Sequence, residues 1–431
     1  MKRNLVAILA IVAAVFIVYR DVHSAYFFED DFQWLAGTLT YDPSSLVDVF
    51  GSGRSHFYRP VIELYFWTAT PLFGGSPRLF HLASVVLHAA NGVLLFFLAR
   101  TLSASDRFAV TAAILFVVLP GYVDAVAWVG ALAEPVGAFF GVSGMLALMA
   151  YRRSRRRRHL AVSVGAFVLA LLTHESSVVF LPLLVLADWV SDDRRPLIPR
   201  SRAEWVATIR LFSPYLAAVA VYAIPDLTVN RHIYLVSESH YRIGLHAIRH
   251  GLDYVVWLYV GKRNLASYVV IVCATALILA GGTRRARFAI GWMIVALLPF
   301  VFFTWGNTSR YLYLPAMGFA ILLAEGVTAL DRLMARWLGT RWRLVLTNLI
   351  VAALTVRFAI FASKTVKAFS NATEPYRAYG VDLRASHPTL PSGSVILIEP
   401  EVDKALKQRY LEGLVQWEYR DPTLRVSVRG Q

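Results

Sequence analysis

The amino-acid sequence predicts an all-α polytopic membrane protein with a large first external loop and a small C-terminal α/β appendage. Of the 431 residues, 57% are hydrophobic, and the mean hydropathy of +0.54 is too apolar for a soluble chain of this length. Several apolar runs are long enough to cross a bilayer, and short basic segments separate them. Counting these runs gives a bundle of about 11 transmembrane helices.

The excess of basic residues indicates membrane topology. There are 43 Lys and Arg residues against 28 Asp and Glu residues, which gives a net charge of +15. Because the basic residues cluster between apolar runs, we assign them to loop orientation and to contact with anionic membrane lipids, and we expect no nucleic-acid partner. The single cysteine, Cys273, lies in an apolar run, so the sequence predicts neither an intrachain disulfide nor a cysteine-based metal site.

The first predicted span is residues 5–19, and two basic residues before it hold its start in the cytoplasm. No small-residue cleavage site follows, so we expect an uncleaved helix. Residues 21–78 then form the large external loop, with three consecutive acids at residues 29–31. Carboxylates at a membrane boundary are costly to desolvate, so their position suggests chemistry or ion binding. Residues 61–73, rich in aromatic side chains and bounded by prolines, are expected to form an interfacial helix.

The remaining spans cross the membrane alternately inward and outward. A run of arginines within residues 152–158 marks a cytoplasmic loop, because translocating it would be prohibitively costly. Residues 225–250 form a second external stretch, which leads to a partial or interfacial helix at residues 254–260. The spans are expected at residues 80–98, 108–119, 136–151, 160–172, 178–190, 205–224, 268–280, 288–303, 311–323 and 344–361.

The last crossing divides the chain into a transmembrane domain of residues 1–362 and a small extracytoplasmic C-terminal domain of residues 363–431. The C-terminus is expected outside because an odd number of crossings precedes it. Within the C-terminal domain, residues 395–398 and 424–428 read as strands, and residues 402–415 read as an amphipathic helix.

The predicted topology, derived from basic loops alone, brings the unusual polar residues to the external side. Acids suit proton abstraction and arginines suit phosphate, so this coincidence points to an external active site of a lipid-phosphate-dependent transferase. The residues are Asp30, Asp31, Arg59, Asp124, Glu134, His174, Glu175 and Arg310.

Short motifs surround these residues: Glu29-Asp30-Asp31, Tyr58-Arg59-Pro60, Phe80-His81, Leu87-His88 with Asn91, Val126-Ala127-Trp128 with Glu134, His174-Glu175, and Arg310-Tyr311-Leu312-Tyr313-Leu314-Pro315 with Met317-Gly318-Phe319. Together they resemble the GT-C class of integral-membrane glycosyltransferases. The likeness is greatest to the membrane half of the tetratricopeptide-repeat-containing protein O-mannosyltransferases. It covers residues 20 to 325, and the C-terminal tail lies outside it and contains no repeats.

The chain departs from the family pattern at four places. Ser84 stands where the family usually has asparagine, and residues 131–133 replace a patch that includes a basic residue. His174 stands where the family has a lysine. Ser309 stands where the family has an acid, directly before Arg310. These departures leave open which sugar and which acceptor are used.

The resemblance implies a GT-C-like bundle that transfers a sugar, with mannose favoured, from a polyprenyl-phosphate donor to a hydroxyl of a protein, lipid or glycan. Asp30 would act as general base, with Asp31 as the second catalytic acid, and the reaction would invert the anomeric configuration. Arg310, Arg59 and His174 would bind the donor phosphate. A bacterial inner or plasma membrane is the expected location, with the active site outside. No metal site is implied, although acids near the base could hold an optional divalent cation. The residues expected to support the site are Glu134, Glu175, Asp124 and His88.

Plainer interpretations stay open for several residues. His88 could be a packed, hydrogen-bonded core residue, and Glu175 could merely cap the following helix. Asp124 could be a solvated loop acid, and Arg310 could anchor a helix at the lipid headgroups. For the whole protein, the alternatives are a polysaccharide polymerase or ligase and a lipid-linked-sugar transporter or flippase. A transporter would carry charged residues along opposite halves of a pore, whereas an enzyme would gather Asp30 and Arg310 in one external cavity.

Overall fold

The computed structural model describes residues 2–41, 49–50, 57–230, 240–259, 261–305 and 307–430. Parts of the expected first external loop, of the expected stretch 225–250, and residues 260 and 306 therefore lie outside the described residues.

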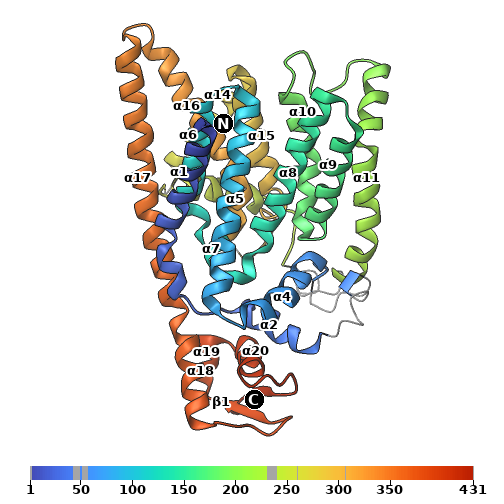
Figure 1. The fold of residues 1–431 in the computed structure, drawn as a ribbon, viewed down its shortest axis with the longest axis vertical. Coiled ribbons are helices and arrows are strands. Elements are labelled where there is room, and N and C mark those ends of the chain that lie inside the picture. Colours follow the sequence, from blue (N-terminus) through green and yellow to red (C-terminus); the bar gives the residue numbers. More distant parts are fainter. Residues whose placement is uncertain are drawn as a thin grey trace.

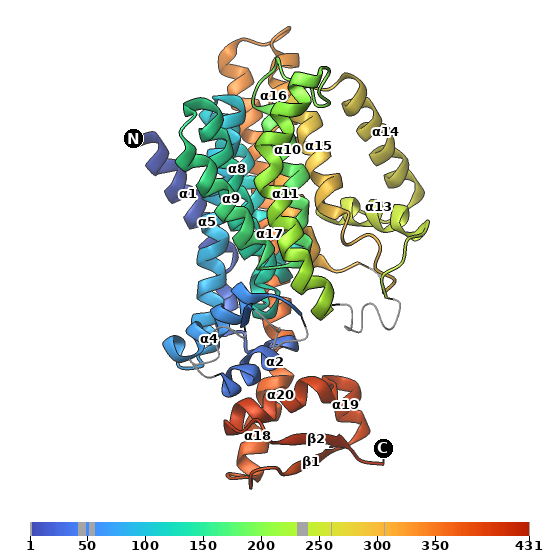
Figure 2. The same cartoon turned by 90° about the vertical axis from the view of Figure 1, so that its right-hand side faces the viewer.

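Long helices run side by side to form a bundle, and a small unit that contains the C-terminus extends from its lower end (Figure 1; Figure 2). Every span expected from hydropathy contains a helix. The helices of the bundle are α1 (Lys2–Val18), α5 (Pro77–Ser103), α6 (Asp106–Val118), α8 (Ala133–Ser154), α9 (Arg157–Leu171), α10 (Phe180–Val190), α11 (Arg202–Asn230), α14 (Leu265–Gly281), α15 (Arg284–Leu297), α16 (Tyr313–Met334) and α17 (Thr340–Ala372).

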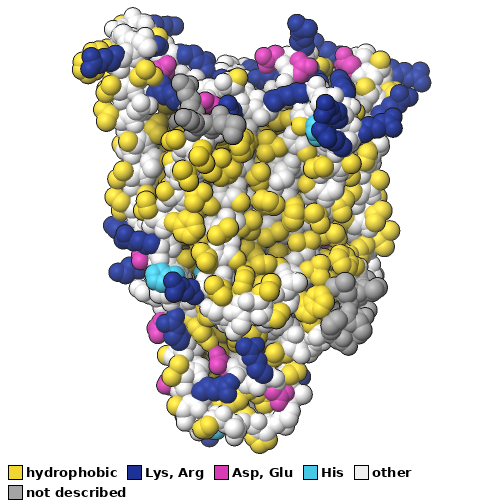
Figure 3. Space-filling model, viewed as in Figure 1, with side chains coloured by type: hydrophobic (Ala, Val, Ile, Leu, Met, Phe, Trp, Pro, Cys, Tyr) yellow, Lys and Arg dark blue, Asp and Glu magenta, His cyan; other side chains and the backbone are white. Residues whose placement is uncertain are grey.

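The bundle presents an apolar belt between two polar ends. Hydrophobic side chains cover the middle of the face in Figure 3, and Lys and Arg side chains gather along its upper rim. By length and composition, five helical segments of the described chain are able to cross a membrane, or six if α6 and its bent continuation form one span. Helices such as α10, with 11 residues, reach only about 16 Å at 1.5 Å per residue. The span count therefore stays a prediction.

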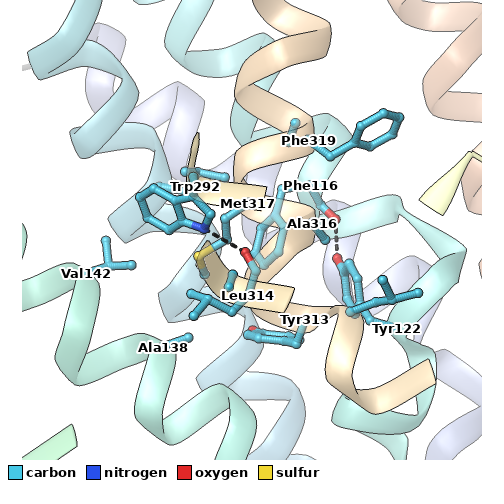
Figure 4. Close-up of a cluster of buried hydrophobic side chains, with 14 of the residues drawn as sticks. Phe116, Tyr122, Ala138, Val142, Trp292, Tyr313, Leu314, Ala316, Met317 and Phe319 are labelled. Atoms are coloured by element: carbon cyan, nitrogen blue, oxygen red, sulfur yellow. Dashed lines mark hydrogen bonds between the residues drawn. The ribbon is translucent and has the colours of Figure 1, made fainter. Parts of the chain in front are cut away.

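The bundle core forms around α16, α15 and the turn after α6 (Figure 4). Trp292 donates its indole N–H to the Leu314 carbonyl at 2.8 Å, and the Tyr122 hydroxyl donates to the Phe116 carbonyl. Gly318 allows α15 and α16 to approach closely, because a Cβ there would lie 2.9 Å from Trp292 Cδ1. The hydrogen bonds of Trp292 and Tyr122 satisfy polar groups that would otherwise be buried without partners.

Shorter elements join the helices of the bundle. Pro120 interrupts the apolar run after α6, and the chain bends there by 47°. Pro299 likewise follows α15, so the expected span at residues 288–303 is wrong at its end: the helix stops at Leu297. The shorter elements are η1 (Arg20–Ser24), α2 (Asp30–Gly37), η2 (Thr38–Thr40), α4 (Pro60–Phe73), η4 (Pro120–Tyr122), α7 (Val123–Ala127), η5 (Val129–Ala131), η6 (Glu175–Val179), α13 (His246–Leu258) and η7 (Ser309–Leu312).

The elements after α17 make up what we call the C-terminal unit. It consists of α18 (Glu374–Ser386), β1 (Val395–Ile398), α19 (Pro400–Leu406), α20 (Gln408–Tyr419) and β2 (Arg425–Val428). β1 and β2 pair in parallel, with Val395 opposite Arg425, and α19 and α20 form the crossover between them.

Two expectations about this region are corrected. The single helix expected at residues 402–415 is instead two helices, because Lys407 has a φ of +59° that breaks the helical run. The boundary expected at residue 362 falls inside α17, which continues unbroken to Ala372. The extracytoplasmic location of the C-terminal unit stays a prediction.

The C-terminal unit shares a hydrophobic core with the segment between α1 and α5. Phe27 and Phe32 pack there with Tyr376, Leu414 and Trp417. The segment that follows α1 therefore meets the C-terminal unit at the lower end of the bundle.

Candidate active site

A cavity of about 2010 Å³ opens at the lower end of the bundle. Its walls come from α2, the start of α8, the α9–η6 connection, residues 298–305 and 308–311, and α20. Six residues expected at the site line it, although they come from distant parts of the chain. They are Asp30, Arg59, Glu134, His174, Glu175 and Arg310.

Asp30 and Asp31 begin α2 but have different surroundings. Asp30 lines the cavity, with 34% of its side chain exposed. Asp31 is fully buried, and its carboxylate accepts the backbone N–H groups of Phe28, at 2.8 Å, and Gly130. Burial raises the pKa of the Asp31 carboxyl, and the two backbone N–H groups act against that rise. Asp31 is thus a fixed anchor of the turn, and Asp30 is the acid that faces the cavity.

The backbone of this turn is held in an unusual conformation. Glu29 has a φ of +43°, a region that non-glycine residues rarely occupy and that costs about 1–3 kcal/mol. The Trp128 indole N–H donates to the Phe28 carbonyl at 3.1 Å, which secures the turn from the side of the bundle. The strain is maintained because hydrogen bonds fix the residues on both sides of Glu29.

Arg310 lies in η7, across the cavity from α2. Its Nη1 is 4.0 Å from Asp30 Oδ2, and its guanidinium lies over the rings of Trp128, at 4.7 Å, and Tyr311, at 5.1 Å. Asp124 accepts a hydrogen bond from the hydroxyl of Ser309, the residue before Arg310. Asp124 is therefore not a simple solvated acid, because it holds η7 and so positions Arg310.

Arg59 and Glu175 form a two-pronged ion pair. Arg59 Nε donates to Glu175 Oε2 at 3.0 Å, and Nη2 donates to Oε1 at 2.6 Å. Although burial raises the pKa of Glu175, Arg59 and His174 lower it to about 2, so the carboxylate is ionised at neutral pH. The capping role considered for Glu175 belongs to His174, whose ring accepts the N–H of Ser176.

His174 is a neutral hydrogen-bond donor at pH 7. Its Nδ1 accepts the Ser176 N–H at 3.1 Å, so the ring proton is on Nε2, which lies 3.6 Å from Glu134 Oε1. Burial and then the charge of Arg59 lower the pKa of His174 to about 3. Any contact with phosphate would therefore use the Nε2–H group and not a full positive charge.

Glu134 and His88 differ in their relation to the cavity. Glu134 is buried at the cavity wall, and its Oε1 makes no hydrogen bond within the described part of the chain. His88 is fully buried away from the cavity, where it contacts the hydroxyl of Tyr313 at 2.9 Å. Asn91 donates both to that hydroxyl and to the carbonyl of Pro135, next to Glu134. His88 is thus a core residue, as its plainer interpretation held.

One wall of the cavity is apolar. It is formed by residues of α10 and by residues at and after the end of α15, namely Leu181, Pro182, Val295, Leu298, Pro299 and Phe300. Across the described residues, no group of three or more His, Cys, Asp or Glu side chains is arranged to hold a metal ion.

Sequence reasoning missed several residues of the cavity wall. Trp128 was noted only as part of a motif, yet it contacts both the turn of α2 and Arg310. The C-terminal unit lies outside the family resemblance, yet Lys407, Arg409 and Tyr410 line the cavity. No local pattern indicated this contact, since α20 is far from α2 in the sequence.

Comparisons with known proteins agree with this architecture. No family model matches the chain. The Drosophila melanogaster protein O-mannosyl-transferase Tmtc1 is 32% identical over 143 residues, which are 32% of this chain and 16% of the fly protein. The chain therefore spans a small part of that relative.

Solved structures resemble the chain over nearly its whole length. ArnT from Cupriavidus metallidurans, bound to undecaprenyl phosphate, aligns with a TM-score of 0.58 at 14% identity, over 99% of this chain and 86% of ArnT. The Archaeoglobus fulgidus oligosaccharyltransferase, tethered to an acceptor peptide, aligns with a TM-score of 0.58 at 12% identity, over 98% of this chain and 63% of that enzyme. At these identities the likeness establishes the fold, and the GT-C fold predicted from the sequence is confirmed.

Proposed function

We propose that the chain is an inverting membrane glycosyltransferase that moves a sugar from a polyprenyl-phosphate donor to an acceptor hydroxyl. One observation carries this proposal: Asp30 and Arg310 face each other, 4.0 Å apart, in a cavity that has both a charged end and an apolar wall. A base, a phosphate ligand and a lipid-compatible surface are the three parts that such a transfer requires.

The proposed reaction is a single displacement. The Asp30 carboxylate accepts the proton of the acceptor hydroxyl as that oxygen attacks the anomeric carbon. A bond forms between the acceptor oxygen and the anomeric carbon, and the bond from that carbon to the phosphate oxygen breaks. The leaving group is polyprenyl phosphate, and attack from the opposite face inverts the configuration.

Arg310 is proposed to stabilise the leaving phosphate. The planar guanidinium matches two phosphate oxygens, and its stacking between Trp128 and Tyr311 limits its motion. A cation held in place before the reaction stabilises developing negative charge without reorganisation in the transition state.

The other charged residues have supporting roles in this proposal. Glu175 fixes the orientation of the Arg59 guanidinium through two of its nitrogens, so Arg59 would donate to the phosphate from the third nitrogen, while the pair as a whole stays neutral. The neutral His174 would donate from Nε2 to the phosphate or hold Glu134, whose buried carboxylate would orient the acceptor or the sugar. Asp124 acts through Ser309 as a positioning residue for Arg310.

The apolar wall between α10 and α15 supports a lipid-linked donor, and the likeness to an undecaprenyl-phosphate-bound enzyme supports it independently. The match to the fly protein favours mannose as the sugar. The acceptor hydroxyl could belong to a protein, a lipid or a glycan, and the archaeal enzyme with its tethered peptide favours a protein. We further propose that the cavity faces the extracytoplasmic side of a bacterial inner membrane, since the arginine-rich turn between α8 and α9 lies at the opposite end.

The function is tested with full-length protein in lipid nanodiscs. Undecaprenyl-phosphate derivatives of mannose, glucose, galactose and N-acetylglucosamine, each labelled in the sugar, are supplied together with washed host membranes as the source of acceptor. We expect release of undecaprenyl phosphate and transfer of label from one donor, with mannose favoured, and a product of inverted configuration. Asp30→Asn should lower the rate about 10²- to 10⁴-fold.

Three results would contradict the proposal. In proteoliposomes, movement of the intact donor across the bilayer without cleavage of its sugar–phosphate bond would indicate a transporter. Parental transfer by Asp30→Asn would remove the base from the mechanism. Repeated addition of sugars to a growing glycan would redirect the assignment to a polysaccharide polymerase.

A further inference from the structure

We propose that the C-terminal unit positions the catalytic base, and that Gly413 of α20 is the residue through which it does so. This inference rests on the proposed function, because it assigns Asp30 as the base. The atoms nearest to a Cβ on Gly413 would belong to Phe32 and Gln33 and not to Asp30. The effect passes through the backbone of α2, so Gly413 is a positioning residue.

α20 approaches the backbone of α2 closely at Gly413. A Cβ atom on this residue would lie 2.9 Å from the carbonyl carbon and oxygen of Phe32 and 3.1 Å from the backbone nitrogen of Gln33. These are backbone atoms of α2, which cannot rotate aside as the end of a flexible side chain can. The helix that begins with Asp30 therefore packs directly against α20 at Gly413.

Further contacts hold the segment before α2 to the C-terminal part of the chain. The Tyr26 hydroxyl donates to Glu418 at 2.6 Å, and the Tyr26 N–H donates to the hydroxyl of Thr373 at 2.9 Å. Lys407 forms an ion pair of 3.4 Å with Glu29, and both residues have positive φ angles. The strained turn that presents Asp30 is thus secured by the C-terminal unit.

The opposite side of this turn is held by the bundle. Gly130 donates its N–H to Asp31, and a Cβ there would lie 3.0 Å from Asp31 Oδ1. The segment around Asp30 therefore lies between two glycines that approach it closely, Gly130 of η5 and Gly413 of α20. In this proposal the position of the segment depends on both contacts.

Apart from its ion pair with Asp30, at 4.0 Å, Arg310 is held by a different set of contacts. Its ring partners are Trp128 and Tyr311, and its element η7 is bonded to Asp124. None of these contacts involves α20 in the part of the chain that the structure describes. A disturbance of α20 should move the base relative to the phosphate ligand, which lowers the rate of transfer and spares donor binding.

The test compares two Gly→Ala variants of the full-length protein. Gly413→Ala introduces the close contact with α2. Gly380→Ala is the matched control, because this glycine also lies in a helix of the C-terminal unit and the three atoms nearest to its Cβ would all belong to Glu418, at ordinary distances of 3.7 to 3.8 Å. Alanine is the better helix former at both positions, so propensity alone would favour both variants.

We expect kcat of Gly413→Ala to fall about 10- to 100-fold, since a misplacement near 1 Å can cost about 10²-fold. Binding of undecaprenyl phosphate, followed by the fluorescence of the cavity tryptophans, should keep its affinity. Amide hydrogen exchange in the peptide of residues 26–37 should accelerate. Gly380→Ala should match the parent in all three measurements.

A second variant covers the case in which Gly413→Ala does not fold. Tyr26→Phe removes only the hydroxyl that bonds Glu418, and it should also lower kcat without lowering donor affinity. Parental kcat in both folded variants would overturn the inference, and so would an equal loss of kcat and donor affinity, which would indicate a general structural defect. Parental transfer by Asp30→Asn would instead overturn the proposed function itself.

Discussion

Replacing Asp31 by asparagine separates the structural acid of the turn from the proposed catalytic acid, Asp30. The carboxylate of Asp31 accepts one backbone N–H on each oxygen, from Phe28 and from Gly130, and it is fully buried. Asparagine has nearly the same size but offers a single acceptor oxygen. Whichever way the amide turns, its NH₂ group faces one of the two backbone N–H donors.

The expected cost follows from this geometry. One hydrogen bond to a charged acceptor is lost and one buried N–H is left without a partner, which costs about 1–3 kcal/mol. Burying an uncharged amide costs less free energy than burying the carboxylate, whose desolvation raises the pKa of Asp31. This difference offsets part of the loss, so we expect a cost in the lower half of this range. Asp30→Asn, by contrast, alters only a partly exposed pair with Arg310, and such pairs contribute about 0–1 kcal/mol.

The assay measures thermal unfolding and sugar transfer on the same nanodisc preparations. Asp31→Asn should unfold a few degrees below the parent and lose part of its turnover as α2 shifts. Asp30→Asn should unfold at the parental temperature and lose nearly all turnover. An unchanged unfolding temperature for Asp31→Asn, together with complete loss of transfer, would refute the reasoning and make Asp31 the base.

Three other predictions concern the ligand site, acidity and topology. Arg310→Lys keeps the charge but loses the planar fork, so donor affinity should fall while the unfolding temperature is kept; parental donor affinity would exclude the phosphate role. Glu175 has its pKa lowered from 4.5 to about 2, so its ion pair with Arg59 contributes full stability above pH 4.5 and loses it as the pH falls toward 2. Glu175→Gln should therefore flatten the acid limb of a plot of unfolding temperature against pH, and an unchanged limb would count against the pair. A reporter active only in the cytoplasm, fused after Gln431, should be silent, whereas a strong signal would invert the proposed topology.

The succession of helices along the chain could largely be predicted from the sequence, because hydropathy and basic loops are properties of short local segments. Each expected span contains a helix, and Asp30, Arg59, His174 and Arg310 line one cavity. The helix boundaries were less accessible where proline intervened, as at Pro299 after α15.

The partners of the site residues could not be predicted. The contact of Asp124 with Ser309, and the role of His174 as the cap of η6, depend on how distant segments pack. Likewise, nothing near Gly413 in the sequence reveals that it lies against Phe32, because the apolar pattern of α20 fits any neighbouring surface. Periodicity specifies which face of a helix is buried, not the element that covers it.

The bonds from Tyr26 to Thr373 and Glu418 join residues 347 and 392 positions apart, which has a consequence for biosynthesis. The ribosome makes the acidic turn early, but its stabilising partners emerge only after every helix of the bundle has been made. Until then, the strained conformation at Glu29 has only its contacts with the bundle and lacks those with the C-terminal unit. A nascent or truncated chain would thus insert into the membrane without a competent base. Sugar transfer would begin only when translation and docking of the last segment are complete, so an unfinished chain would not consume lipid-linked donor.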